Sequence, residues 1–485
     1  MGWFKNMVKN WLNIQENPGI SIMIQETNTF EGNCFENEMW YRGNASELHQ
    51  YYTQFDDFVG NSRFWGAEST EGIKFRKIHT GLPKTIVNTL ADILIENFNG
   101  IEIKGNDDNK KAWEKIKEEN VMQELLYDTF VDLMIIGDGA FKIRYDTEIS
   151  EYPIIEFYSG KDVEFERIGK RIKAVIFKTQ YNCDNTQYTL KERYEITGKK
   201  SVTYKLYDSN DKLVKLSKIP ELANLKTIEE NEFPLAIPVI PVKSKTFKGR
   251  GESLFEGKKE NFDSFDEVWS QWIEAIRDNR TITYIPEDLI PRDKEGNLLS
   301  ANTFDRRYVK IEKSSKENDS SKVQRESSDF DYEGMLSSYC TALDLCLNGK
   351  VSPSTLGIDT KKLDNSEAQR EKEKTTLNTV KKYIRTINPV LNKLAEISIN
   401  AYEKQEKKAI SDVEAEAKFA EYANSSFEAV VETISKARPG QSIMSIEQSV
   451  EELYGDSLTK EQKEKEVQRL KEEAGILVVE EPSIV

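Results

Sequence analysis

The chain has 485 residues, a formal net charge of −16, and 31% charged against 38% hydrophobic residues. This length exceeds one ordinary core and predicts two to four domains or subdomains. Aromatic residues at 10% argue against wholesale disorder. The acidity argues against a module that grips DNA through clustered lysines and arginines. It is compatible with a surface past which DNA slides, the simpler interpretation being a charge that only keeps the protein soluble.

The small numbers of cysteines and histidines argue against metal sites, and the short apolar runs argue against membrane segments. The four cysteines form no CxxC pair, which is typical of a long chain in a reducing compartment. Two histidines are too few for a histidine-rich zinc site. No apolar run approaches the roughly 20 residues of a membrane helix, and the amphipathic segment 1–17 lacks the apolar region of a signal peptide. We therefore expect no metal, no cofactor and no membrane association.

Helical periodicity dominates the first part of the chain. Residues 46–58 begin with a serine N-cap and place apolar side chains on one face. Residues 83–98 begin with a proline, which is tolerated at the first helical position. Residues 109–135 are expected to continue as helix until Gly137, after which residues 140–146 form a strand.

Between about 150 and 245 the hydrophobic period changes to two, which predicts strands. The predicted strands are 154–158, 171–181, 187–196 and 201–208. The proline-rich segment 234–242 is expected to be an edge strand or an extended segment. Helices and antiparallel strands together predict an α+β fold.

Two amphipathic helices flank an insert in the second half. Residues 258–279 form the clearest helix, with acids on the face opposite its apolar stripe. That stripe includes Phe262, Phe265, Trp269, Trp272 and Ile276. A second helix is expected at 331–348, after strand-like pieces and a polar, serine-rich stretch at 313–329. Such an arrangement can project from a body as a hairpin, although the pattern alone specifies no function.

The rest of the chain is loop, long helix and charged segments. Residues 350–365 are loop-like and lead into a long helix at 366–404, which Pro389 is expected to kink. Segment 412–420 alternates like a strand but has the Ala and Glu content of a helix, so its type stays open. Further helices fit residues 425–437, 445–454 and 459–474.

A search for catalytic motifs finds none. The stretch 249–259 has the wrong spacing for a phosphate-binding GxxxxGK[ST] loop, and GxSxG and HExxH are absent. Asp263, Asp266 and Glu267 could belong to the metal site of a nuclease, but a solvated helix face is the simpler interpretation. His79 is interpreted as a packing or capping residue. We therefore expect no enzymatic activity.

Several segments, in their order along the chain, resemble the portal proteins of siphophages that infect low-GC Gram-positive bacteria. The resembling segments are NEMWYRGNASELHQYY at 37–52, KIHTGLPKTIVNTLADIL at 77–94, IIGDGAFKIRYD at 135–146, GRGESLFEGKKENFDSFDEVWSQW at 249–272, STLGIDTKKLDNSEAQREKEKTTLNT at 354–379 and SIMSIEQSVEELYG at 442–455. None is a catalytic motif, so the specificity of the resemblance comes from their number and order.

The resemblance implies a division of the chain and a set of partners. The division is wing 1–257, stem helix 258–279, clip 280–330, stem helix 331–349, tunnel loop 350–365, long wing helix 366–404 and crown 405–485. Portal subunits form a ring, usually a dodecamer, at one capsid vertex of the virion, after assembly in the host cytoplasm. Double-stranded DNA is packaged and ejected through the channel. The expected partners are the terminase large subunit, the scaffold protein, the major capsid protein and the head-completion or adaptor protein.

The resemblance also implies roles for individual residues. The apolar stripe of the first stem helix, namely Phe262, Phe265, Trp269, Trp272 and Ile276, is expected to pack against a neighbouring subunit, with the polar face toward the channel. Lys350, Lys361 and Lys362 of the tunnel loop are hypothesised to meet the DNA backbone transiently, the simpler interpretation being solvated loop lysines. The tip at 313–329 is hypothesised to order when a partner docks. The alternatives are another head or connector structural protein and, less favoured, a metal-dependent DNA-processing enzyme.

Overall fold

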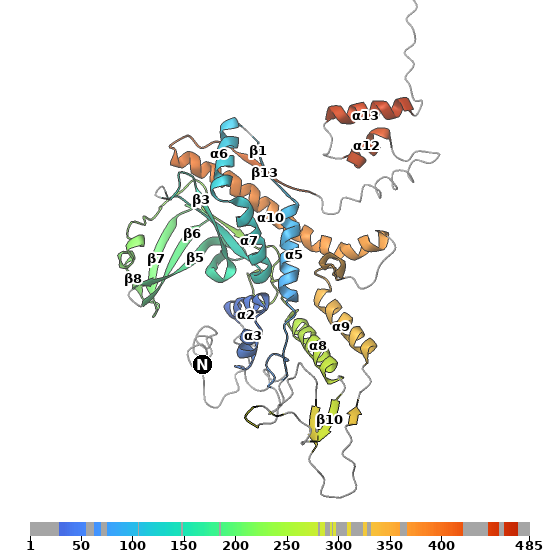
Figure 1. The fold of residues 1–485 in the computed structure, drawn as a ribbon. Coiled ribbons are helices and arrows are strands. Elements are labelled where there is room, and N and C mark those ends of the chain that lie inside the picture. Colours follow the sequence, from blue (N-terminus) through green and yellow to red (C-terminus); the bar gives the residue numbers. More distant parts are fainter. Residues whose placement is uncertain are drawn as a thin grey trace, which may run out of the picture. The chain divides into compact units, whose positions relative to one another are not determined.

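The computed structural model describes most of the chain as two compact units, Met1–Phe419 and Ala420–Val485. The described residues are 29–54, 63–68, 75–104, 106–146, 149–183, 186–279, 282–286, 292, 294–296, 308–311, 324–326, 331–358, 366–420, 445–454 and 460–473. They combine helices with several separate sheets (Figure 1), which confirms the expected α+β class. The amphipathic segment 1–17 lies outside the described residues.

Five helices lie in the described residues before Gly137. They are α2 (Phe30–Arg42), α3 (Ala45–Tyr52), α5 (Leu82–Glu96), α6 (Asp107–Glu119) and α7 (Met122–Ile136). The predicted helices at 46–58 and 83–98 correspond to α3 and α5, although α3 already ends at Tyr52. Helix α2 was not predicted. Its N-cap Thr29 accepts a hydrogen bond from Gly32 N at 3.0 Å, which satisfies one of the free amides of the first turn.

The single helix predicted over 109–135 is wrong, because α6 and α7 are separate helices. The break lies at Asn120 and Val121, and Val121 adopts a left-handed conformation with φ 43°. The Asn120 side chain holds this turn in place: its Nδ2 donates to Pro153 O at 2.9 Å and its Oδ1 accepts from Ile155 N at 2.7 Å. A tertiary contact therefore ends a helix that local periodicity would have continued.

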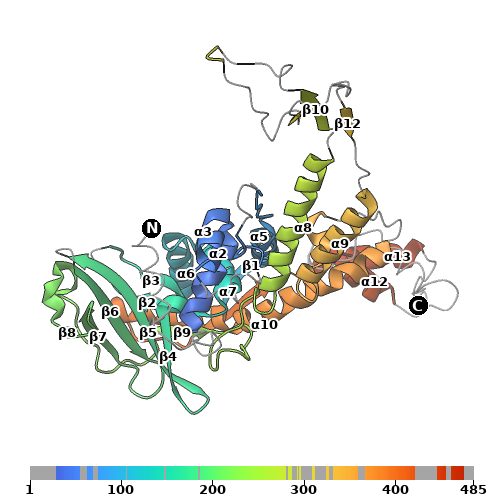
Figure 2. The ribbon, with the colours of Figure 1, turned by 90° about the horizontal axis from the view of Figure 1, so that it is seen from below.

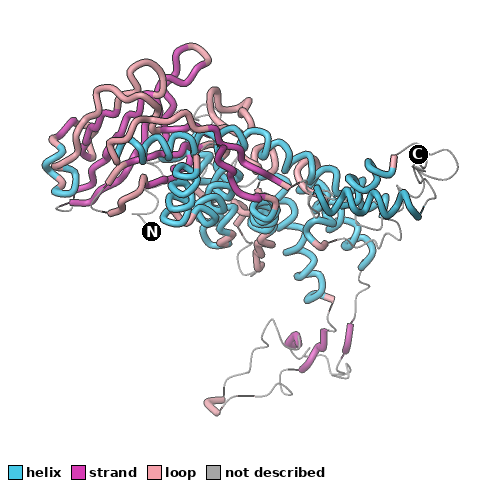
Figure 3. Tube along the Cα trace, turned by 90° about the horizontal axis from the view of Figure 1, so that it is seen from above, coloured by secondary structure: helices cyan, strands magenta, loops and turns pink. Residues whose placement is uncertain are grey.

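Two antiparallel sheets follow the helices. The first has the order β3-β2-β9, from β2 (Gly139–Arg144), β3 (Ile154–Ser159) and β9 (Ala236–Val239). The second is a five-stranded meander of β4 (Val163–Ile168), β5 (Arg171–Cys183), β6 (Thr186–Glu195), β7 (Val202–Asp208) and β8 (Leu213–Val214) (Figure 3). The four predicted strands are confirmed, and β9 lies at a sheet edge as its prolines indicated. Strand β4 was not predicted.

A buried lysine joins the two sheets. Lys142 on β2 is 3% exposed, and its Nζ lies 2.9 Å from Glu192 Oε2 on β6 and 3.0 Å from Glu156 Oε2 on β3. Burial alone would lower the pKa of Lys142, but the two carboxylates hold it above its usual range. A buried charge of this kind is tolerated because both of its partners are in place.

A second junction brings two glycine-flanked turns into direct backbone contact. Asp138 is fully buried, and its Oδ1 accepts from Arg250 Nη2 at 2.8 Å while its Oδ2 accepts from Gly251 N at 2.5 Å. The Arg250 guanidinium also lies 3.8 Å from the centre of the Phe30 ring. A Cβ at Gly251 would lie 2.0 Å from Gly137 O, so only glycine fits there. This junction fixes the loop that leads into the helix at 258–279.

Segment 412–420, whose type the sequence left undecided, contains a strand. This strand pairs with a second strand that was not predicted. β13 (Glu414–Phe419) is antiparallel to β1 (Phe98–Lys104). Its outer amides are capped by the long helix α10 (Ser366–Gln405): Asn392 Oδ1 accepts from Ala417 N at 2.7 Å, and Glu396 Oε1 accepts from Ala415 N at 3.4 Å. Helix α10 matches the predicted long helix and continues through Pro389 without a break.

The second unit contains two described helices, α12 (Ile446–Tyr454) and α13 (Lys460–Glu473). They confirm the predictions at 445–454 and 459–474, whereas the helix predicted at 425–437 lies outside the described residues. Ion pairs connect the two helices, with Lys463 Nζ 2.8 Å from Glu451 Oε1 and Lys471 Nζ 2.5 Å from Glu447 Oε1. In neither unit does a described helix combine the length and hydropathy needed to cross a membrane.

Acidic side chains gather around one lysine where α2, α7 and the β3–β4 turn meet. Lys161 Nζ lies 2.6 Å from Glu38 Oε1. Burial raises the pKa of the nearby Asp132 to about 6, with Lys161 opposing and Glu38, Asp128 and Asp162 adding to the rise. The folded protein therefore binds this proton more tightly than the unfolded chain does, so the contribution of Asp132 to stability falls as pH rises from about 4 to about 6.

Asp132→Asn is accordingly expected to stabilise the protein at pH 8 by about 1–2 kcal/mol, because the amide removes a charge that the fold disfavours. Below about pH 4 the gain should vanish, since the carboxyl is then neutral in both states. Thermal unfolding followed by circular dichroism at both pH values measures this. Asp128→Asn, on an exposed site one turn earlier in α7, is the control and should give a clearly smaller gain. An equal gain for Asp132→Asn at low and high pH would contradict the assignment.

Candidate functional site: the stem helices and their anchors

Helices α8 (Lys259–Asp278) and α9 (Tyr332–Leu347) confirm the two amphipathic helices predicted from the sequence. They pack side by side (Figure 2) and run antiparallel, since the start of α8 contacts the end of α9 and Trp272 contacts Tyr332 near the start of α9. We call this pair the stem helices.

An aromatic seam holds the stem helices together. The Tyr339 ring on α9 lies 5.1 Å from that of Phe265, 5.7 Å from that of Trp269 and 5.6 Å from that of Trp272, measured between ring centres. Edge-on and tilted ring pairs at these distances contribute about 0.5–1.5 kcal/mol each beyond the area they bury. One tyrosine therefore joins three successive turns of α8.

The seam corrects part of the predicted subunit-packing surface. Phe262, Phe265 and Trp272 are only 3%, 2% and 9% exposed within a single chain, so they pack against residues of their own chain. Phe262 contacts the rings of Trp40 and Phe255. Trp269 is half-buried in the seam, and Ile276 is 44% exposed. Periodicity identified an apolar face correctly, but it could not tell an intrachain partner from a neighbouring subunit.

Asp266 is the centre of a buried polar network between α8 and the segment before α5. Its carboxylate is 1% exposed. Oδ1 accepts from Thr80 N at 2.9 Å and from Thr80 Oγ1 at 2.8 Å, while Oδ2 lies 2.6 Å from His79 Nδ1 and accepts from Trp65 Nε1 at 3.1 Å. Ser270, one turn later, accepts from Ile78 N at 2.9 Å.

Asp263 adds a second anchor one turn earlier. It is 7% exposed and accepts from Phe64 N at 2.8 Å and from Trp65 N at 3.2 Å. Burial raises the pKa of Asp263 and these two amides lower it in part. Lys77 fastens the same loop by donating to Phe64 O at 2.5 Å. The interpretation of Asp263 and Asp266 as a solvated helix face is therefore wrong.

His79 behaves as the packing residue that the sequence predicted. Its side chain is 3% exposed, and its ring lies 5.6 Å from that of Trp40 and 6.2 Å from that of Trp65. A Cβ at Gly43 would lie 3.0 Å from His79 Nε2, so the side of the ring away from Asp266 is closed by the end of α2. The histidine–aspartate pair has no open side toward a substrate.

The end of α9 is fastened to the start of α8. Leu345 O accepts from Lys258 Nζ at 2.8 Å and from Asn261 Nδ2 at 3.0 Å, which satisfies one of the free carbonyls of the last turn. Burial lowers the pKa of Lys258. The end of α9 is thus fixed to the start of α8, whose own anchors lie in the body.

Of the three lysines hypothesised to meet DNA, the structure describes Lys350 alone. Lys350 Nζ lies 3.1 Å from Glu252 Oε1, and Thr379 Oγ1 on α10 donates to Lys350 O at 2.6 Å. Lys350 is therefore an anchored, ion-paired residue and not a solvated loop lysine. Lys361 and Lys362 lie outside the described residues. The hypothesis that these lysines meet DNA is untested.

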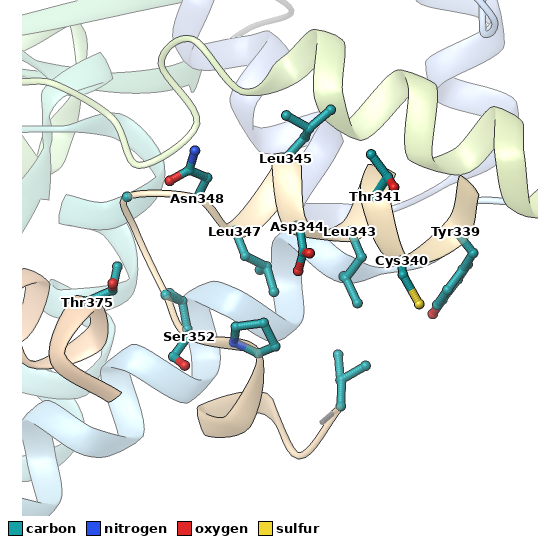
Figure 4. Close-up of a pocket in the computed structure, with 14 residues that line it drawn as sticks. Tyr339, Cys340, Thr341, Leu343, Asp344, Leu345, Leu347, Asn348, Ser352 and Thr375 are labelled. Atoms are coloured by element: carbon teal, nitrogen blue, oxygen red, sulfur yellow. The ribbon is translucent and has the colours of Figure 1, made fainter. Parts of the chain in front are cut away.

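A pocket of about 600 Å³ lies beside the end of α9 (Figure 4). Apolar side chains from α9 and from the following turn line it, among them Leu343, Leu347, Val351 and Pro353, together with Thr375 from α10. The turn itself is held by hydroxyls, since the buried Thr376 accepts from Ser352 N at 2.9 Å. The titratable side chains that line the pocket, Tyr339, Cys340 and Asp344, all belong to α9.

The segment between the stem helices forms a small sheet of its own. β10 (Ile282–Pro286) pairs in parallel with β11 (Tyr308–Ile311) and antiparallel with β12 (Gln324–Glu326). Strand β10 confirms one of the predicted strand-like pieces. Strand β12 lies within the polar stretch at 313–329, of which the remaining residues are outside the described part. Within the described ranges, no group of three or more His, Cys, Asp or Glu side chains is placed to hold a metal ion.

Comparisons with known proteins give only weak similarities. No protein-family model matches the chain, and no curated protein sequence matches it. Among solved structures, similar chains occur in the virion of a native gene transfer agent particle and in the neck of that particle computed with C12 symmetry. Both share 11% identity, and the alignments cover 80% of this chain and 90% of theirs, with TM-scores of 0.37 and 0.38. TM-scores below 0.5 do not establish a common fold.

Proposed function

We propose that this chain is the subunit of a phage portal ring, a channel at one capsid vertex through which double-stranded DNA is packaged and ejected. The observation that carries the proposal is the stem: two antiparallel helices, anchored to the body by buried carboxylates, that bracket a separate three-stranded sheet. The order of the segments that resemble siphophage portals also supports two stem helices, at 258–279 and 331–349, around an insert at 280–330.

The stem helix α8 has the two faces that a ring channel needs. Its outer stripe is polar and rich in carboxylates, formed by Glu260, Ser264, Glu267, Gln271, Glu274 and Asp278. At 3.6 residues per turn these six side chains lie on one side of the helix. In the proposed ring this stripe faces the channel, where it repels phosphate, so that DNA slides and is not held.

The proposal assigns partners by position. The β10–β11–β12 sheet at the end of the stem receives the terminase large subunit during packaging and a head-completion or adaptor protein afterwards. The body that carries α2 to α7, the β3-β2-β9 sheet and the five-stranded sheet faces the scaffold and major capsid proteins. No catalytic role is proposed, because the most enzyme-like pair, His79 and Asp266, is enclosed by packed residues.

A second function is another structural protein of the phage head or connector. It would use the same anchored stem without a closed ring, so the assembly state separates the two functions. A dodecamer of 55.9-kDa chains would have a mass of about 670 kDa.

Ile276→Asp is expected to reduce the ring fraction at least tenfold without unfolding the subunit, because it places a charge on an exposed apolar position of the stem. Mass photometry of the purified protein measures the ring fraction. Ile168→Asp is the matched control: Ile168 is 67% exposed on β4, far along the chain from the stem. If the two variants formed the same fraction of rings, Ile276 would not belong to the contact between subunits. Absence of any ring in the unmodified protein would contradict the portal proposal itself.

A further inference from the structure

Helix α10 carries an unusual concentration of positive charge for a chain whose net charge is −16. From residue 374 to residue 395 the sequence contains five basic residues and no acidic one. They are Lys374, Lys381, Lys382, Arg385 and Lys393. In a chain with 84 acidic and 68 basic residues, such an acid-free stretch marks a local reversal of charge.

These side chains share one exposed side of the helix. With 100° between successive residues, Lys381, Lys382, Arg385 and Lys393 fall within about 120° of one another around the axis, and all four are exposed. The opposite side of α10 is core: Val380, Tyr383, Ile387, Leu391 and Leu394 are each buried. We call the exposed side, defined by those four residues, the basic face of α10.

No residue in the described ranges neutralises the basic face. Lys381, Lys382, Arg385 and Lys393 form no ion pair with any described side chain. Elsewhere on the surface lysines commonly have acidic partners, as Lys104 has in Glu416 at 3.0 Å. Within the described part of the chain, nothing therefore competes with an external anion for these four cations.

The chemistry of the face favours a nucleic acid over a protein as its partner. Stable protein interfaces have an apolar core from which lysine is depleted. Between its cations the basic face exposes one apolar residue of α10, Pro389, so charged side chains dominate this side of the helix. Pro389 and Lys393 also border a small pocket of about 320 Å³ beside β9. The cations extend over about 18 Å of helix axis at 1.5 Å per residue, a length along which duplex DNA presents a continuous row of phosphates.

We infer that the basic face of α10 is a phosphate-backbone contact surface for double-stranded DNA. This inference rests on the proposed function, since packaged DNA is the polyanion that a portal meets, and it places the contact on α10 and not on the tunnel-loop lysines. Contacts to phosphates made by four cations position DNA without reading its sequence. The affinity should therefore be independent of sequence and steeply dependent on salt.

The test measures binding of the purified full-length protein to a fluorescent duplex of about 30 base pairs at several salt concentrations. The variant combines Lys381→Gln, Lys382→Gln and Arg385→Gln. The control combines Lys110→Gln, Lys115→Gln and Lys117→Gln, three lysines of α6 whose side chains are 53%, 59% and 41% exposed. Both variants remove three positive charges, so a general effect of net charge would be the same in each.

We expect the α10 variant to bind at least tenfold more weakly at low salt and to lose about 2–3 from the slope of log affinity against log salt, at about 0.9 per phosphate contact. The α6 control should change affinity less than twofold. Equal losses in the two variants, or no binding by the unmodified protein, would overturn the inference. The inference would also be overturned if the α10 variant bound DNA as tightly as the unmodified protein but formed an assembly of lower mass. That result would show that the basic face is a contact between copies of this chain. Mass photometry of the same samples tests the ring separately: DNA binding through α10 without any ring would refute the portal proposal and leave the DNA-contact surface standing.

Discussion

Asp266→Ala should destabilise the protein by about 3–5 kcal/mol, or prevent the stem from docking at all. The substitution removes the acceptor for the donors of Trp65, His79 and Thr80, of which the Trp65 and His79 side chains are buried and Thr80 is half-buried. A buried donor that loses its partner costs about 1–3 kcal/mol, and the substitution leaves several such donors together. Thermal unfolding and protease sensitivity of the 63–81 region measure the effect.

Glu267→Ala, on the next residue, is the control for this prediction. Glu267 lies on the outer stripe of α8, and among the described residues its carboxylate accepts a side-chain hydrogen bond from Gln271 Nε2 on its own helix at 2.9 Å. Its removal should change stability by less than about 0.5 kcal/mol. If Asp266→Ala and Glu267→Ala had similar effects, the carboxylate anchor would not be what holds the stem to the body.

Gly251→Ala is expected to be the most disruptive single-methyl change in the described part of the chain. The new Cβ would lie 2.0 Å from Gly137 O and 2.4 Å from Gly137 C, and both are backbone atoms that cannot rotate away. Overpacking of this kind costs about 1–3 kcal/mol and more when the backbone must move. The Asp138–Arg250 pair depends on the same close approach, so we expect a cost of about 3 kcal/mol or more, or failure to fold.

Gly169→Ala separates this steric effect from backbone strain. Gly169 has φ 60° and open space around its Cβ position, so alanine there costs only the left-handed conformation, about 1 kcal/mol. Thermal midpoints of both variants are compared with that of the unmodified protein. A larger decrease in thermal midpoint for Gly169→Ala than for Gly251→Ala would contradict the close approach of the two turns.

The stem helices were predictable because their signal is local. An amphipathic stripe over 258–279 specifies a helix whatever it packs against. The anchors were not predictable, because the donors to Asp266 lie 186 or more residues away in sequence. An acid beside an apolar stripe has the same pattern whether it faces water or a buried histidine. Asp263 and Asp266 were therefore assigned to solvent.

The same physical limit explains the errors in secondary structure. The break between α6 and α7 depends on hydrogen bonds between Asn120 and both Pro153 and Ile155. The helical periodicity of 109–135 carries no information about such distant contacts. Strand β13 could not be distinguished from helix until β1 was known to pair with it. The basic face of α10 was visible as sequence, but its exposure on one side of a helix became evident only when the buried side was known.

Electron microscopy of the purified full-length protein, with class averages viewed along the assembly axis, tests the central proposal most directly. We expect closed rings with a central opening and about a dozen lobes, with the stem helices around the opening. Monomers, or open filaments that never close, at every protein concentration would contradict the portal function.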